Sequence, residues 1–318
     1  MHSWNRPLLV FTGVMVLLIP VCLGGLLLDP RTLGGAAIWA KPLKFSISLA
    51  LYGATLAWMV SLVRSPRAHR VASGAATVVA AAGVIEMVAI VGQVVRGVGS
   101  HFNTATAFDT AVYAVMGSSI SVLWVANLVI AVLLLRERSL AMATGWAVRL
   151  GLVVSLLGMA VAFLMTSPSG AQIEGARTSG ALPVTGGHAV GVADGGAGLP
   201  LLGWSTTGGD LRVGHFVGLH GMQVVPLVAL GLLLLASRVP ALRTERVRVR
   251  LVAVAAGAWT GLTLLLVWQA LRGQPLLAPD ALTLAAAAVL GVGTLLAAAA
   301  VLRRAPRPAV DEPVAVAA

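Results

Sequence analysis

The strongest constraint in this sequence is a series of long apolar runs, each near the roughly 20 residues that a helix needs to cross the hydrocarbon core of a bilayer. The runs lie near residues 8–28, 43–63, 71–95, 111–135, 147–166, 212–236, 250–270 and 281–302. Apolar runs of this length are typical of transmembrane helices. The sequence therefore predicts an all-α integral membrane bundle of about eight transmembrane helices.

Composition excludes the other broad classes of protein. Of 318 residues, 58% are hydrophobic and 10% are charged, whereas soluble domains carry about 25% charged residues. The net charge of +11 would suggest a nucleic-acid partner in a soluble protein, but here the basic residues lie in short loops, where they set topology. No nucleic-acid partner is expected. The single cysteine, Cys22, excludes an internal disulfide and a cysteine-built metal site.

The distribution of basic residues predicts the orientation of the chain. Of the 22 Lys and Arg residues, 15 lie on the same side as both termini if every run crosses the membrane, and seven lie on the other: Arg31, Lys41, Lys44, Arg96, Arg177, Arg212 and Arg272. The positive-inside rule then places both termini in the cytoplasm of a multi-pass cell-membrane protein. Residues 1–302 are expected to form one transmembrane domain, and the Pro- and Ala-rich tail 303–318 is expected to be disordered.

One loop, residues 167–210, is much longer than the others and lies on the extracytoplasmic side. It is rich in glycine and contains Trp204. A loop this long is generally either a functional lid or a disordered linker. Its low charge and its interspersed Leu, Val and Trp residues favour a lid folded onto the bundle.

Glu86 is the carboxylate that lies well within a predicted span. An ionisable group at that depth costs about 2.5–3.5 kcal/mol on insertion scales, so it usually faces a cavity or a partner. Since the bilayer interior disfavours the charged form, Glu86 is a candidate proton donor or relay. The structural alternative is a protonated Glu that forms a hydrogen bond between helices.

Polar residues continue from Glu86 towards the extracytoplasmic end of the same span. They are Gln93, Arg96, His101 and Asn103, and Asp109 begins the next span. Lys41 and Lys44 open the second span at the same face. These two lysines are either interfacial anchors or cations that bind an anionic head group together with Arg96 and Arg212.

The sixth span carries the strongest polar signal. Asp210 precedes it, and the i, i+3, i+4 spacing places Arg212, His215, His220 and Gln223 on one stripe. Glu86 and His220 each lie roughly 14–15 Å from the outer ends of their helices at 1.5 Å per residue. If the two helices touch, we expect these side chains to face one chamber. The alternative is that these polar groups only join helices.

Several chemistries lack the motifs that they require. No HExxH or many-histidine box is present, so no metal is predicted. His215 and His220 lie about 140° apart around a helix and cannot both ligate one haem from the same side. No cofactor is therefore predicted, although a haem or quinone redox protein remains an alternative. No GxSxG, Walker or GxGxxG motif is found.

The motifs resemble those of a large group of uncharacterised bacterial polytopic membrane proteins, from Lys41 to Pro226. The residues that carry the resemblance are Glu86-x6-Gln93-x2-Arg96-Gly97-x3-His101-Phe102-Asn103 and Gly209-Asp210-Leu211-Arg212-x2-His215-Phe216-x-Gly218-x-His220-x2-Gln223. In size, helix count and mid-membrane acid the chain also resembles the bacterial membrane-bound terpene cyclases of prenylated-indole pathways. The motif of those cyclases is not matched residue by residue.

The second resemblance implies an enzyme that protonates an alkene or epoxide and guides the carbocation to ring closure. Under this resemblance, the role of proton donor is the only one that is assigned to residues of this chain. It is assigned first to Glu86 and then to Asp210 or Asp109. The candidate catalytic residues are Glu86, Asp210, His215 and His220. The candidate binding residues for a lipophilic prenylated substrate are Lys41, Lys44, Gln93, Arg96, His101, Asn103, Asp109, Trp204, Arg212 and Gln223. The alternative is a proton-coupled carrier of a small anion or lipid, in which Glu and His form a proton relay.

Overall fold

The computed structural model describes residues 4–305 and is an all-α membrane bundle, as predicted. Its long helices are α1 (Arg6–Leu28), α2 (Ala40–Ser61), α3 (Pro66–Arg96), α4 (Ala107–Arg136), α5 (Met142–Met165), α9 (Glu245–Leu271) and α10 (Ala281–Arg303). Within the described residues these seven are long and apolar enough to cross a membrane. The bent pair α7 (Leu211–Leu219) and α8 (Gly221–Leu235) passes the same test when the two helices are taken together, and counting the pair as one span brings the number to eight. The prediction of disorder in the tail concerns mostly residues 306–318, which lie outside the described residues.

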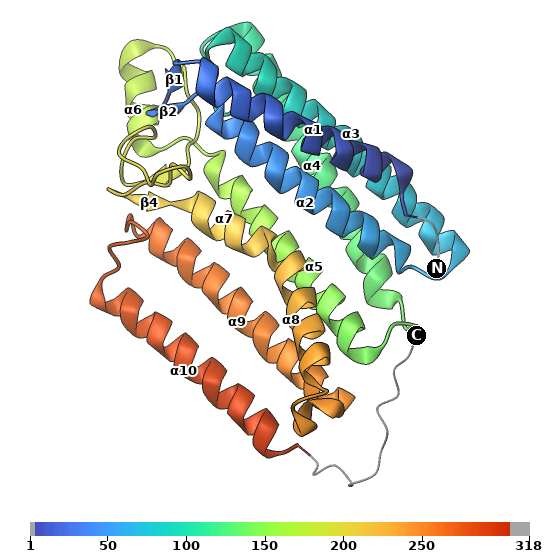
Figure 1. Cartoon of the computed structure of the whole chain (residues 1–318). Coiled ribbons are helices and arrows are strands. Elements are labelled where there is room, and N and C mark those ends of the chain that lie inside the picture. Colours follow the sequence, from blue (N-terminus) through green and yellow to red (C-terminus); the bar gives the residue numbers. More distant parts are fainter. Residues whose placement is uncertain (1–3, 306–318) are drawn as a thin grey trace.

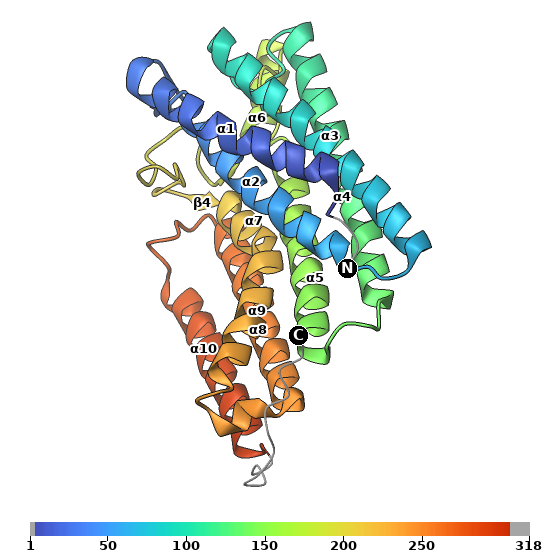
Figure 2. The same ribbon diagram turned by 45° about the vertical axis from the view of Figure 1, so that its right-hand side comes forward.

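The helices form two groups on either side of α5. Helices α1 to α4 pack together on one side and α7 to α10 on the other, as Figures 1 and 2 show. Helix α5 packs against α4, α7, α8 and α9, and so joins the two groups. Helix α3 has its main packing contacts with α1, α2 and α4. This arrangement separates Glu86 on α3 from the histidines of the sixth span.

Local sequence signals fix the helix ends that matter for the site. The side chain of Thr106 caps α4 by accepting the backbone N–H of Asp109. Helix α3 ends at Gly97, whose φ of 77° lies in the left-handed region that glycine adopts without strain. The chain therefore turns sharply after Arg96 and leads into the segment that carries His101.

The sixth predicted span is not one straight helix. It is broken at His220 into α7 and α8, which are bent by 45° relative to each other. Helix α7 also lies very close to α5, because Gly158 and Gly218 face each other. A Cβ atom on Gly158 would lie 2.3 Å from the backbone carbon of Gly218. The single polar stripe expected along residues 212–223 is divided by this bend.

One end of the bundle, here termed the capped end, is covered by the connections 29–39, 97–106, 166–210 and 272–280 (Figure 1). Within it lie α6 (Gly170–Ser179) and the short strand pairs β1 (Thr32–Leu33) with β2 (Ala36–Ala37) and β3 (Ala189–Val190) with β4 (Gly209–Asp210). A short 3-10 helix, Pro240–Arg243, lies at the opposite end.

The glycine-rich loop is folded onto the bundle rather than extended away from it. The backbone N–H of Thr185 donates to the carbonyl of Phe102, and that of Gly187 donates to the carbonyl of Met165. The ammonium group of Lys44 on α2 donates to the carbonyl of Leu202 at 2.8 Å. These bonds join the loop to α2, to the end of α5 and to the segment after α3.

Candidate functional site

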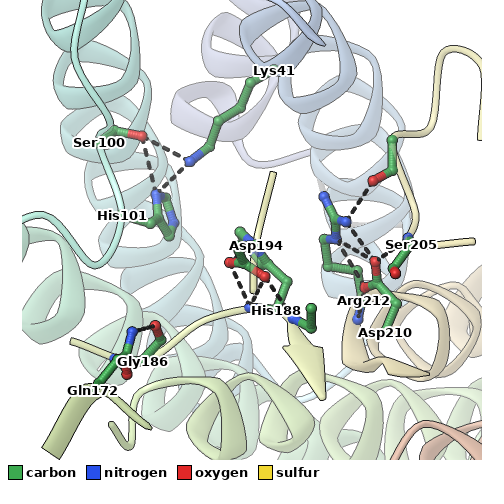
Figure 3. Close-up of polar contacts among 12 residues, drawn as sticks. Lys41, Ser100, His101, Gln172, Gly186, His188, Asp194, Ser205, Asp210 and Arg212 are labelled. Atoms are coloured by element: carbon green, nitrogen blue, oxygen red, sulfur yellow. Dashed lines mark hydrogen bonds and ion pairs between the residues drawn. The ribbon is translucent and has the colours of Figure 1, made fainter. Parts of the chain in front are cut away.

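The centre of the candidate site is a hydrogen-bonded chain of three side chains from two helices and one loop. The Nζ atom of Lys41, at the start of α2, lies 2.9 Å from Nδ1 of His101 and 2.8 Å from Oγ of Ser100. The Nε2 atom of His101 lies 3.1 Å from Oε1 of Glu86 on α3. Figure 3 shows the Lys41, Ser100 and His101 part of this chain.

The direction of these hydrogen bonds follows from what each group can donate. An ammonium group has only donors, so Nδ1 of His101 accepts from Lys41. Burial, followed by the positive charge of Lys41, holds the pKa of His101 well below its usual range. The neutral ring then carries its one proton on Nε2 and donates it to Oε1 of Glu86.

The second carboxyl oxygen of Glu86 has a different environment. Oε2 is buried and has no hydrogen-bond partner among the described residues, and the whole residue is 2% exposed. A buried carboxylate with one oxygen unpaired is costly because a charge has been removed from water without compensation. The arrangement fits a carboxylic acid that accepts from His101 at Oε1 and carries its proton on Oε2. Such a group is able to donate a proton.

His188 and Asp194 lie beside this chain, although neither was among the site residues predicted from the sequence. The carboxylate of Asp194 accepts the backbone N–H groups of His188 and Ala189 and lies 3.0 Å from Nδ1 of His188. These bonds hold the pKa of Asp194 well below its ordinary value, against the opposing effect of burial. The imidazole of His188 packs against Phe102, with ring centroids 4.9 Å apart.

Asp210, Arg212 and Lys44 attach the loop to the bundle. Oδ1 of Asp210 accepts from Nε of Arg212 at 2.9 Å, and Oδ2 accepts from the backbone N–H of Ser205 at 2.8 Å. Arg212 also donates to the carbonyl of Gly203 at 2.6 Å (Figure 3). Both oxygens of Asp210 therefore accept hydrogen bonds, one of its partners being a guanidinium, and they hold the loop against the start of α7.

The hydrogen bonds of the sixth-span histidines go to residues other than Glu86. Nδ1 of His215 lies 2.8 Å from the carbonyl oxygen of Gly158 on α5. The close approach of Gly158 and Gly218 draws α7 onto α5, which brings His215 within hydrogen-bond distance of that carbonyl. The partner of Glu86 is His101, a residue of the segment after α3, and not a histidine of the sixth span.

His220 lies at the break between α7 and α8. Its Nδ1 is 3.3 Å from Oε1 of Gln223, and Nε2 of Gln223 is 3.3 Å from the hydroxyl of Thr55 on α2. Nε2 of His220 is buried and has no partner among the described residues. The ring of Phe216 packs on His220 at 4.3 Å and on Trp204 at 5.8 Å between centroids.

Three of the remaining predicted binding residues, Gln93, Arg96 and Asp109, bond to one another and join α3 to α4. Nε2 of Gln93 lies 2.9 Å from Oδ1 of Asp109, and Arg96 pairs with the same carboxylate at 2.5 Å. Nδ2 of Asn103 donates to the carbonyl of Gly99 at 3.0 Å. These contacts stabilise the turn that presents His101, so the four residues position the site rather than line it.

The two halves of the capped end interact electrostatically. The charged forms of His188 and His215, like that of Lys41, lower the pKa of His101. Burial lowers the pKa of His188 most, and the charges of Arg212 and Lys41 lower it further, against the opposing effect of Asp194. Within residues 4–305, no group of three or more His, Cys, Asp or Glu side chains is arranged to hold a metal ion. The site is thus a cluster of acid, imidazole and ammonium groups beneath a folded loop.

The chain has no match among family models, curated proteins or solved structures. Its resemblance to the uncharacterised bacterial membrane proteins and to the terpene cyclases stays a prediction. The geometry of the site is therefore the basis for any functional assignment.

Proposed function

We propose that this protein is a membrane enzyme that protonates an alkene or epoxide of a prenyl chain and so starts its cyclisation. The observation that supports this most strongly is the Glu86 carboxyl group, which His101 holds at one oxygen and which has a buried, unpartnered second oxygen. General acids of this kind work in sites from which water is excluded.

The proposed reaction returns the enzyme to its starting state. The O–H bond of Glu86 breaks as its proton forms a C–H bond with one carbon of the alkene, whose π electrons are used, or an O–H bond with the epoxide oxygen, whose C–O bond opens. Either step leaves a carbocation on the substrate and a carboxylate on Glu86. The cation closes the ring by accepting electrons from a second double bond. Loss of a proton from the cyclic cation to the Glu86 carboxylate completes an isomerisation with no change in atoms.

His101 and Lys41 have defined roles in this scheme. While Glu86 is negatively charged, the N–H of His101 donates to Oε1, and the Lys41 ammonium behind the ring adds a positive charge. Preorganised donors of this kind stabilise charge as it develops. His101 and Lys41 are therefore positioning residues that act through Glu86.

The basic residues support an orientation with both termini in the cytoplasm. The capped end is then extracytoplasmic, and a lipophilic substrate reaches Glu86 from the bilayer. The folded loop excludes water from the site on that side.

The test compares membranes that contain the parent protein, Glu86→Gln or Asp210→Asn. Each is incubated with a prenylated indole that carries a terminal alkene or epoxide, and lipophilic products are measured by mass spectrometry. We expect a cyclic isomer of unchanged mass from the parent and none from Glu86→Gln. Asp210→Asn should retain conversion as long as it folds. Conversion by Glu86→Gln at the parental rate would refute the proposal.

A proton-coupled carrier is the second candidate, and the broken span favours it. Discontinuous helices form the substrate and ion sites of many transporters. Here the break lies at His220, whose Nε2 is buried without a partner among the described residues. Proteoliposome uptake of the same prenylated compound that requires a pH gradient and yields no product would favour the carrier over the enzyme.

A further inference from the structure

A groove on the outer surface of α3 and α4 shares Gln93 and Arg96 with the contacts that position His101, but neither Glu86 nor His101 lines it. It has a volume of about 540 Å³, within the roughly 300–1,000 Å³ range of ligand pockets. Its walls are Val84, Ile85, Val88, Ala89, Gly92 and Gln93 of α3 and Phe108, Ala111, Val112 and Val115 of α4, and Arg96 lies at its end.

The groove faces the surroundings of the bundle rather than its interior. Val88 and Val115, on its two walls, are 67% and 54% exposed. Both helices are long and apolar enough to cross a membrane, so these surfaces face lipid. Small residues at Ala89, Gly92 and Ala111 form the hollow between the larger side chains. An apolar chain in the bilayer is the kind of molecule that fits this space.

Arg96 supplies the single charge among the residues that line the groove. Its guanidinium stacks on the ring of Phe108, with 4.6 Å from Cζ to the ring centroid. Its side chain is 40% exposed, whereas the side chain of its ion-pair partner Asp109 is 3% exposed and lies behind it. The charge presented at the end of the groove is therefore positive.

The bonding of Arg96 leaves donors for an anion. The bonds from Arg96 to Gln93 and Asp109 both use NH1. A guanidinium has five N–H donors in a planar fork that matches phosphate oxygens. The edge away from Asp109 is thus suited to a phosphate group at the membrane interface.

From this arrangement we infer that the groove binds an anionic membrane phospholipid, with an acyl chain between α3 and α4 and the phosphate at Arg96. This inference does not rest on the reaction proposed at Glu86, although Arg96 also belongs to the contacts that position His101. Charge complementarity at Arg96 favours an anionic lipid over a zwitterionic one.

Native mass spectrometry of the full-length protein tests this inference. The protein is purified in detergent, and the retention of phosphatidylglycerol is compared with that of phosphatidylcholine carrying the same acyl chains. We expect phosphatidylglycerol to be retained roughly two- to fivefold more strongly, the range for a partly exposed ion pair. Arg96→Gln should remove this preference. Equal retention of both lipids by the parent would overturn the inference.

A second variant tests the groove without disturbing the Arg96–Asp109 pair. A Cβ atom on Gly92 meets no atom within 4 Å, so the side chain of Gly92→Leu begins in open space, at a residue that lines the groove. Losing contact with about two methylene groups should weaken retention of both lipids roughly tenfold. Gly117→Leu is the matched control, because Gly117 lies on α4 outside the groove and also has open space at its Cβ position.

Two results of this comparison would contradict the inference. Undiminished retention of phosphatidylglycerol by Gly92→Leu would show that the lipid lies elsewhere. Retention of a prenylated indole in place of phosphatidylglycerol, lost in Gly92→Leu and kept in Gly117→Leu, would assign the groove to a lipophilic substrate instead.

Discussion

Replacing Glu86 by Gln or by Leu distinguishes a neutral acid from a carboxylate in the folded protein. Gln keeps an oxygen that accepts from Nε2 of His101 and resembles a protonated carboxyl group in shape and charge. Leu keeps the approximate volume but removes the acceptor. The two variants therefore separate the effect of the charge from the effect of the hydrogen bond.

The structure sets the size of the two effects. In Glu86→Leu the buried N–H of His101 loses its acceptor, which should cost about 1–3 kcal/mol of unfolding free energy. In Glu86→Gln a neutral hydrogen bond replaces a neutral one, so the loss should stay well below about 1 kcal/mol. If Glu86 were ionised, its bond to His101 would contribute about 1.5–3 kcal/mol, and Gln would forfeit much of that contribution.

Unfolding in detergent, followed by tryptophan fluorescence, measures these differences. Ile85→Leu is the control, because Ile85 is a half-exposed neighbour on the same helix. We expect the order of stability parent, Glu86→Gln, Glu86→Leu, with the larger step before Leu. A Glu86→Gln protein as unstable as Glu86→Leu would refute the neutral assignment.

Three further predictions concern the packing and the loop. Gly158→Ala should lose about 1–3 kcal/mol of unfolding free energy because its Cβ would clash with α7. The control, Gly117→Ala, places its Cβ in open space and should gain up to about 1 kcal/mol. Equal thermal stability of the two proteins would contradict the packing of α5 against α7. Since the pKa of Asp194 is depressed, its stabilisation of the loop should be present above about pH 4 and decline as the pH falls further. The protection of residues 188–194 from hydrogen–deuterium exchange, relative to the intrinsic rate at each pH, should decrease over that range. In Asp194→Asn this protection should already be low at neutral pH. Because the pKa of His101 is lowered, the neutral ring contributes stability that is fully present above about pH 6.5 and declines as the pH falls below that value. The melting temperature of the parent protein should therefore fall as the pH is lowered. A His101→Gln protein whose melting temperature depends on pH in the same way would contradict this role of His101.

The sequence predicted the spans well because hydrophobicity along a helix is a local property. The predicted boundaries of the second and third spans, 43–63 and 71–95, lie within a few residues of α2 and α3. Glu86 was also identifiable, because a carboxylate in the middle of an apolar run is costly unless it has a partner.

The partner of Glu86 could not be predicted from the same information. His101 reaches Glu86 because Gly97 reverses the chain and Lys41, distant in sequence, fixes the ring. The bend at His220 and the contact between Gly158 and Gly218 likewise depend on how helices pack, which helical periodicity within one span does not reveal. Tertiary contacts therefore determined the site, although its residue types were visible in the sequence.

The most direct test of the central claim is infrared spectroscopy of the carboxyl groups in the parent protein and in Glu86→Gln at neutral pH. A protonated carboxyl group has a C=O stretching band that is separate from the bands of carboxylates. We predict such a band in the parent that shifts in deuterium oxide, is perturbed in His101→Gln and is absent from Glu86→Gln. A parent spectrum without this band, or one in which Glu86→Gln removes only a carboxylate band, would contradict the account.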